Sequence, residues 1–209
     1  MIARRFLLAR AAGLALLALL PAASWAQSAV DLSRKAVLED PVAPKWSRPG
    51  YDVTIVEFAD YNCGYCHRLQ PTLNALMQSD RKVRMVYRDW PIFGADSREI
   101  ARYAIASQWQ GRHAAFHNAL MTTSGHLNAA QVRAVATRAN VDWARLNRDL
   151  ALHGEEIDAL LARTSAIVGA IGGNGTPLLI VGSQIVPGAI DLPTLRQLVK
   201  AARAKPAGG

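Results

Sequence analysis

The chain contains two cysteines, and both belong to the motif Cys63-Gly64-Tyr65-Cys66. Two thiols at this spacing can form a disulfide and exchange it with the thiols of another protein through a mixed disulfide. As a purely structural crosslink the pair would close a loop of four residues, which gains only about 2 kcal/mol in the chain-entropy model. We therefore interpret the pair as a redox centre.

The residues on either side predict where the two cysteines lie. Residues 53–59 are rich in β-branched side chains and predict a buried strand, whereas apolar residues recur at helical spacing from Gly64 to Gln78. The N-terminus of a helix presents unpaired N–H groups and a positive dipole end, which stabilise a thiolate. We expect Cys63 to be the exposed nucleophile and Cys66, one turn later, to be the more buried cysteine that resolves the mixed disulfide.

The rest of the chain predicts how this strand and helix are completed. Residues 83–87 read as a second strand, and residues 95–171 carry only helical patterns, ending with a short helix from Asp142 to Leu146 and a longer one over 157–171. A hairpin at 178–186 and a last helix capped by Asp191 follow. This order indicates an α/β, thioredoxin-like fold, with a core of residues 51–94 and 172–204 and an inserted all-helical domain of residues 95–171.

The N-terminal segment predicts export. Residues 1–26 combine three arginines, an apolar run and a small-x-small cleavage site, the pattern of a signal peptide, and residues 27–50 form a turn-rich lead-in. Removal of residues 1–26 would leave 21 basic against 16 acidic residues. No basic run exceeds two or three residues, so we expect no nucleic acid partner. A periplasmic location would let disulfides persist.

A family resemblance rests on three motifs: residues 57–67 (EFADYNCGYCH), Gly175-Thr176-Pro177, and Val186-Pro187-Gly188. Together they resemble exported DsbA-type thiol–disulfide oxidoreductases over most of residues 50–203. The resemblance implies unfolded or partly folded protein substrates, a membrane-embedded redox partner, and neither cofactor nor metal. It also implies a cis Thr176–Pro177 bond that turns the Thr176 backbone toward the cysteines.

Three residues near the motif leave questions open. Glu57 interrupts an apolar strand, and a buried carboxylate there needs a reason; strand alternation does not settle which face it takes. The resemblance implies that Glu57 lies beneath Cys66 and shuttles its proton. The imidazole of His67 either stabilises a thiolate or points to solvent. The Gly64-Tyr65 pair looks more like the isomerase branch than the Pro-His of the strongest oxidases, and the Tyr65 ring should border the site.

Several alternatives accompany the preferred function, a protein thiol oxidase. An isomerase or reductase of the same fold, one linked to copper stress included, fits the motif, although residues 27–50 are too few for a dimerisation domain and offer only a short oligomerising helix around Leu32, Ala36 and Val37. Cys63-x-x-Cys66-His67 also matches the attachment motif of c-type haem. Two thiolates could bind Cu(I). His113 and His117 have a ligand-capable spacing, but we expect them to be surface or half-buried histidines.

Overall fold

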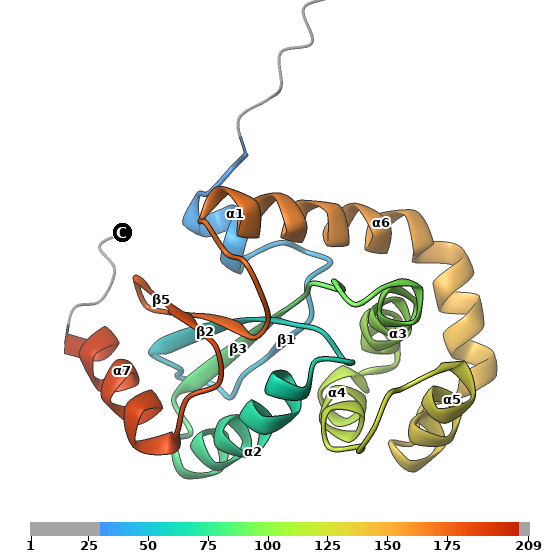
Figure 1. Ribbon diagram of the computed structural model, residues 1–209, viewed down its shortest axis with the longest axis horizontal. Coiled ribbons are helices and arrows are strands. Elements are labelled where there is room, and N and C mark those ends of the chain that lie inside the picture. Colours follow the sequence, from blue (N-terminus) through green and yellow to red (C-terminus); the bar gives the residue numbers. More distant parts are fainter. Residues whose placement is uncertain (1–29, 205–209) are drawn as a thin grey trace, which may run out of the picture.

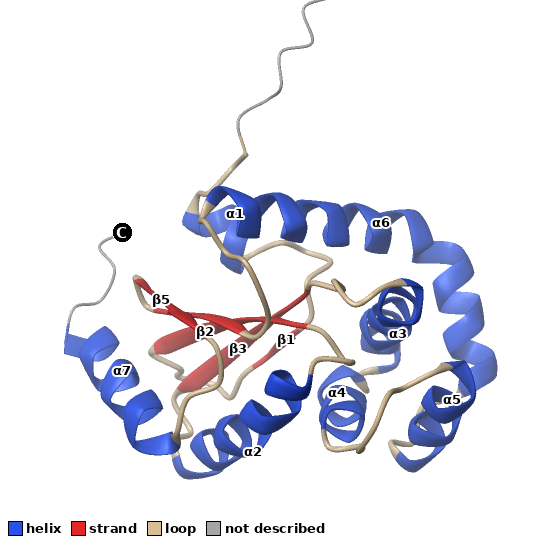
Figure 2. Ribbon diagram, in the orientation of Figure 1, coloured by secondary structure: helices blue, strands red, loops and turns tan. Residues whose placement is uncertain are grey.

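The computed structural model describes residues 30–204, so the predicted signal peptide lies outside the described residues. This part of the chain forms five strands, seven α-helices and one 3-10 helix (Figure 2). In chain order they are α1 (Arg34–Leu38), β1 (Lys45–Trp46), β2 (Val53–Ala59), α2 (Gly64–Ser79), β3 (Val83–Asp89), α3 (Ala95–Ala106), the 3-10 helix η1 (Ser107–Gln110), α4 (His113–Met121), α5 (Ala129–Arg138), α6 (Trp143–Ala170), β4 (Leu178–Val181), β5 (Gln184–Pro187) and α7 (Leu192–Ala204).

The five strands form one sheet in the order β1-β3-β2-β4-β5. β2 runs parallel to β3 and antiparallel to β4, and β4 and β5 form the predicted hairpin. β2 is therefore the central strand, and all but one of its residues are buried. Because the cysteine motif follows β2 directly, the most buried strand of the sheet leads into the motif.

Helices cover both faces of the sheet (Figure 1). Alternate residues of β2 point to opposite faces. Val56 and Phe58 pack with α1 and with the helices from α3 to α6, whereas Ile55 packs with α2 and α7. α2 and α7 lie together below the sheet in this view, and α1 and α6 lie above it. This layered α/β arrangement confirms the predicted fold class.

The region between β3 and β4 is helical throughout. Asn128 forms the expected capping box with Gln131, and Asp142 caps α6. However, the prediction of two separate helices after Asp142 was wrong, because α6 is one helix of 28 residues that bends along its length (Figure 1). Gly154 lies within this helix, and a Cβ there would come within 3.1 Å of the Arg102 guanidinium, the flexible end of a side chain on α3.

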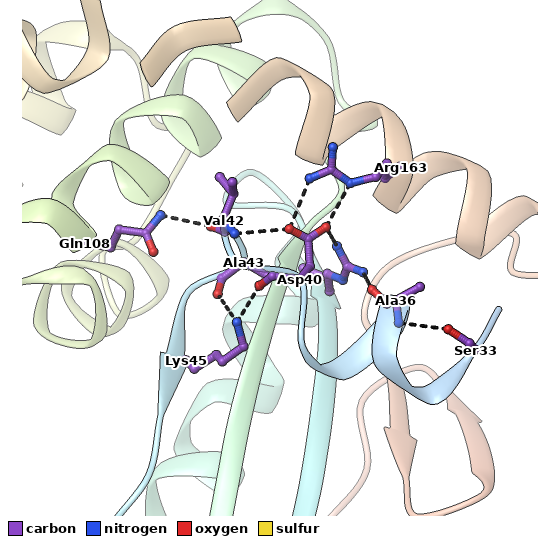
Figure 3. A network of polar contacts seen from close by, with 9 residues as sticks. Ser33, Ala36, Asp40, Val42, Ala43, Lys45, Gln108 and Arg163 are labelled. Atoms are coloured by element: carbon purple, nitrogen blue, oxygen red, sulfur yellow. Dashed lines mark hydrogen bonds and ion pairs between the residues drawn. The ribbon is translucent and has the colours of Figure 1, made fainter. Parts of the chain in front are cut away.

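Buried and partly buried ion pairs connect the segment after α1 to the sheet and to α6 (Figure 3). The fully buried Arg88 of β3 donates to Asp40 at 3.0 Å, and Arg163 of α6 donates to both oxygens of Asp40 at 2.9 and 3.0 Å. Arg84 binds Glu39 in the same way, at 2.6 and 2.7 Å. The short N-terminal helix that we expected is present, but its Val37 packs into the core of its own chain.

None of the helices between residues 30 and 204 is both long and apolar enough to cross a membrane.

Candidate active site

Cys63 is the N-cap residue of α2, and Cys66 lies in the first turn. Both are free thiols in this structure. The Cys63 thiol donates a hydrogen bond of 3.2 Å to the backbone carbonyl of Thr176, 113 residues further along the chain. Only 3% of Cys63 is exposed, so our expectation of an exposed sulfur was wrong. The segment that contains Thr176 covers the sulfur in a way that no local pattern indicates.

The two thiols have opposite electrostatic environments. A hydrogen bond from the Cys66 thiol, helped by the Thr176 hydroxyl and by the N–H groups at the start of α2, lowers the pKa of Cys63 to about 5. The same contact holds the proton on Cys66, and burial adds to it, so the pKa of Cys66 is raised. At neutral pH Cys63 is therefore the thiolate and Cys66 the thiol, as the position at the helix terminus predicts.

The Thr176–Pro177 peptide bond is cis, which confirms the expectation from the resemblance. These residues directly precede β4, which pairs with the central strand β2. The Thr176 hydroxyl, which helps to lower the pKa of Cys63, is buried and has no hydrogen-bond partner of normal geometry among the described residues.

The residues between and after the two cysteines have different surroundings. Gly64 has open space where a side chain would be, and Tyr65 is 59% exposed with the Arg68 guanidinium stacked 3.8 Å above its ring. The His67 ring places Nε2 2.7 Å from the backbone carbonyl of Tyr61. His67 is therefore bound to the loop that precedes the cysteines, and it neither points to solvent nor accounts for the low pKa of Cys63.

That loop is fixed by two residues that the sequence analysis missed. The buried carboxylate of Asp60 accepts hydrogen bonds from the N–H groups of Ile92 and Phe93, at 2.7 and 3.0 Å. The Asn62 side chain accepts from the Leu127 N–H at 2.7 Å and donates to its carbonyl at 3.2 Å. Asp and Asn are typical turn residues, so the sequence could have indicated a turn here. It could not indicate their hydrogen-bond partners, which lie 32 to 65 residues away in the chain.

Glu57 is buried on the α2 face of the sheet and is 1% exposed. Neither of its oxygens has a hydrogen-bond partner among the described residues. Burial raises the pKa of its carboxyl to about 8, so the group is mostly protonated at pH 7. Its charge, when present, also raises the pKa of Cys66, so the two groups are electrostatically coupled. Both faces of β2 are covered by helices, and Glu57 takes the face toward α2.

His113 and His117 are 6% and 1% exposed, so the expectation of surface or half-buried histidines was wrong. Both face the sheet from α4, and burial lowers the pKa of His117 to about 3, which keeps the ring neutral. Nδ1 of His117 lies 3.0 Å from the Tyr61 hydroxyl and Nε2 lies 3.6 Å from Glu57. Within residues 30–204 no group of three or more His, Cys, Asp or Glu side chains has a geometry that could hold a metal ion.

The profile of the DSBA-like thioredoxin domain matches residues 54–200, a span that contains the cysteines, Glu57 and the cis proline. The chain belongs to this family. Among solved structures, this DSBA-like chain is similar to a thioredoxin-like oxidoreductase from Silicibacter pomeroyi DSS-3, with 40% identity and a TM-score of 0.77. The alignment covers 82% of this chain and 98% of that one.

Two further solved structures agree on the fold. The thiol-disulfide exchange protein α-DsbA2 from Wolbachia pipientis is 26% identical, with a TM-score of 0.75 over 80% of this chain and 90% of that one. A periplasmic thioredoxin-like protein from Salmonella enterica serovar Typhimurium is also 26% identical, with a TM-score of 0.74 over 82% and 95% of the two chains. The matched domain of the DSBA-like chain is accordingly of the thiol–disulfide oxidoreductase type.

Curated relatives include the Na(+)/H(+) antiporter NhaA 3 of Salinispora tropica, which is 28% identical over 169 residues. That match covers 75% of this DSBA-like chain and 25% of the antiporter. The chain thus spans about a quarter of the length of these relatives.

Proposed function

We propose that the protein is an exported, periplasmic oxidase of protein thiols, with Cys63 as the nucleophile and Cys66 as the resolving cysteine. The observation that carries this proposal is the opposite shift of the two thiol pKa values at the start of α2. Cys63 leaves readily as a thiolate when a second substrate thiol attacks the mixed disulfide, and Cys66 keeps its proton until a base removes it.

The reaction balances within the two thiol pairs. A substrate thiolate attacks Cys63 Sγ of the oxidised protein, forming a mixed disulfide and releasing Cys66, which gains a proton. A second substrate thiolate then attacks the substrate sulfur, and Cys63 leaves as a thiolate. The substrate has lost two electrons and gained a disulfide, and the protein has become the dithiol. A redox partner protein, which we expect to be membrane-embedded, would accept these electrons and restore the Cys63–Cys66 disulfide.

In this scheme Glu57 is the proton donor and acceptor for Cys66. Its burial, its raised pKa and its electrostatic coupling to Cys66 support the role. When the partner reoxidises the protein, Glu57 as a carboxylate removes the Cys66 proton, and the resulting thiolate attacks Cys63. When a substrate is oxidised, Glu57 as an acid returns that proton to Cys66.

Exposed side chains around the thiol pair support protein substrates. Tyr65 between the cysteines is 59% exposed, and Ile92 and Phe93, which are bonded to the active-site loop through Asp60, are 41% and 53% exposed. Apolar and aromatic groups of this kind suit unfolded chains, whose apolar residues are accessible. The Thr176 backbone beside Cys63 would pair with the substrate strand.

The low pKa of Cys63 favours an oxidase over a reductase. A stabilised thiolate stabilises the reduced protein and makes its disulfide more oxidising. The value of about 5 lies between the values of about 7 for thioredoxin and about 3.5 for the most oxidising relatives. An isomerase is the second candidate, because Gly64-Tyr65 resembles the isomerase branch and supplies no charge of its own. The c-type haem alternative gains no support, since the His67 ring is already bonded to Tyr61.

We also propose a division of labour within the chain. The thioredoxin-like core, residues 51–94 and 172–204, would carry the cysteines, Glu57 and Thr176-Pro177, and the helical domain, residues 95–171, would support them. Hydrogen bonds between Asn62 and Leu127 and between Tyr61 and His117 connect the two parts at the active site.

Equilibration with glutathione tests the proposed function. We expect a reduction potential well above the value of about −270 mV for thioredoxin and nearer to about −120 mV. The protein should oxidise a reduced, unfolded substrate rapidly and repair a scrambled one slowly. Cys63→Ser should abolish both reactions. A potential near −270 mV, or scrambled-substrate repair faster than oxidation, would favour the reductase or isomerase instead.

A further inference from the structure

Four ionisable side chains form a continuous chain of contacts behind the cysteines. Glu57 Oε2 lies 3.6 Å from Nε2 of His117, Nδ1 of His117 lies 3.0 Å from the Tyr61 hydroxyl, and that hydroxyl lies 3.3 and 3.4 Å from the two oxygens of Asp89. Each of the four residues is at most 2% exposed. The chain joins two buried carboxyl groups through one imidazole and one phenol.

The unsatisfied Glu57 carboxyl is the feature that most needs an explanation. Buried polar groups in native proteins nearly always have a hydrogen-bond partner, yet both Glu57 oxygens have none among the described residues. At 3.6 Å the contact to His117 is slightly too long for a hydrogen bond, and a shift of about half an ångström would close it. Catalytic hydrogen bonds are often long in the resting protein and tighten during the reaction.

A neutral imidazole can serve Glu57 in either protonation state. With the proton on Nδ1, His117 donates to Tyr61 and its Nε2 can accept from the Glu57 acid. With the proton on Nε2, His117 donates to the Glu57 carboxylate and accepts from Tyr61. The Gln70 side-chain oxygen, 3.3 Å from Nε2, can also accept in the second state. The hydroxyl of Tyr61 can likewise donate toward His117 or toward Asp89.

The surrounding charges favour a single negative charge shared between Glu57 and Asp89. Burial raises the pKa of Asp89 well above its usual value, and the charge of Glu57 raises it further. The other ionisable groups packed against the cluster are Cys66 from α2, Tyr87 from β3, His113 from α4 and the buried Asp60 after β2, whose charge also raises the pKa of Asp89. None of them supplies a positive charge at neutral pH, so a second carboxylate would have no counter-ion.

We propose that His117, Tyr61 and Asp89 form a buried proton relay that takes the proton from the Glu57 carboxyl, so that Glu57 can then accept the proton of Cys66. This inference rests on the proposed role of Glu57. At rest Glu57 is protonated and Asp89 carries the negative charge. Glu57 passes its proton to Nε2 of His117, Nδ1 passes its proton to the Tyr61 oxygen, and the Tyr61 hydroxyl proton moves to the Asp89 carboxylate. The Cys66 proton then moves to the Glu57 carboxylate, and the Cys66 thiolate attacks Cys63, which breaks the mixed disulfide and releases its other sulfur as a thiolate.

The relay forms the Glu57 carboxylate without access to solvent. The negative charge moves from Asp89 to Glu57 with no proton gained or lost in the cluster, and Glu57 then takes up the one proton that Cys66 loses. His117, Tyr61 and Asp89 act through Glu57 and are positioning residues.

Tyr61→Phe tests the relay, because it removes one hydroxyl and keeps the ring. Cys63 is loaded as a mixed disulfide with glutathione, and release of glutathione by Cys66 is followed in a single turnover between about pH 5 and pH 9. We expect the release rate to fall about tenfold near neutral pH, with an altered pH profile. The rate and pH midpoint of Cys63 alkylation should not change.

Tyr87→Phe is the matched control, because it removes a buried hydroxyl from the same cluster. The Tyr87 ring packs against His117, with centroids 4.6 Å apart, but its hydroxyl is not part of the chain of contacts. We expect the wild-type profile for this variant. Asp89→Asn, which keeps the shape of the side chain and removes the final acceptor, should reproduce the slow release and protects the test against misfolding of a single variant.

The outcomes separate the relay from the role of Glu57. If Glu57→Gln slows release but Tyr61→Phe and Asp89→Asn follow the wild-type profile, the relay is refuted and the role of Glu57 stands. If Glu57→Gln also follows the wild-type profile, the proposed role of Glu57 fails, and the relay fails with it. Equal slowing of Cys63 alkylation and of release in Tyr61→Phe would indicate a structural effect and would also refute the relay.

Discussion

The replacement Glu57→Gln should make the protein more stable while it impairs exchange. The pKa of the carboxyl rises from 4.5 to about 8 on burial. At pH 7 the unfolded chain therefore carries the carboxylate, whereas the folded protein must hold a proton on it. Holding that proton costs about 1.4 kcal/mol for each pH unit between the unfolded pKa and pH 7, or about 3 kcal/mol in total. A glutamine has a similar shape and avoids this cost.

The pH dependence gives the prediction its sign. A carboxyl whose pKa is raised in the folded state destabilises the protein as pH rises from the unfolded pKa to the folded one, because the folded state binds more protons. The advantage of Glu57→Gln should therefore be close to zero at about pH 4.5, reach about 3 kcal/mol at pH 7 and level off above about pH 8. The stability advantage at pH 7 depends little on the pKa of Glu57 in the folded protein, provided that Glu57 stays protonated at that pH.

Urea unfolding of the reduced proteins at several pH values measures the difference in free energy of unfolding. Glu155→Gln is the control, because Glu155 is an exposed carboxylate of α6 and its replacement should change the free energy by less than about 0.5 kcal/mol. A Glu57→Gln protein that is no more stable than the wild type at pH 7, or an advantage that does not shrink toward pH 4.5, would refute the argument that Glu57 is buried as a neutral acid.

Three further predictions concern the thiols and the loops that hold them. Alkylation of Cys63 should follow a thiolate that forms above about pH 5 and is lost below it, and Cys66→Ala should move that midpoint upward, because the Cys66 thiol is the main donor to Cys63. A midpoint that stays in place would contradict this assignment. Arg88→Ala should lower the free energy of unfolding by about 3–5 kcal/mol, since it removes a buried partner of Asp40; a loss below about 1 kcal/mol in urea would count against the pair. Asn62→Ala should lower the free energy of unfolding by about 2 kcal/mol in the same assay, because it leaves the Leu127 N–H without its acceptor. An unchanged unfolding midpoint would show that this N–H finds another acceptor.

The features that could be predicted from the sequence have local causes. The strand at residues 53–59, the helix from Gly64 and the caps at Asn128 and Asp142 follow from spacing and from side chains that bond to nearby backbone. The cis bond before Pro177 followed from the resemblance, which joined two motifs over a hundred residues apart.

The features that were missed depend on distant contacts. Burial of Cys63 depends on Thr176, 113 residues away, and the position of His117 depends on Tyr61, 56 residues away. A histidine four residues from another on a helix has the same spacing whether that helix faces solvent or a sheet.

The long helix α6 has a mechanical consequence for the whole protein. Leu146 near its start is buried in the core with α5, while Arg163 near its end holds Asp40 beside α1. One continuous helix therefore connects the helices at the far side of the sheet to the segment around α1. Neither part can unfold without disturbing the other, so heating should produce one cooperative transition, and a protein cut within α6 should not behave as two independent modules.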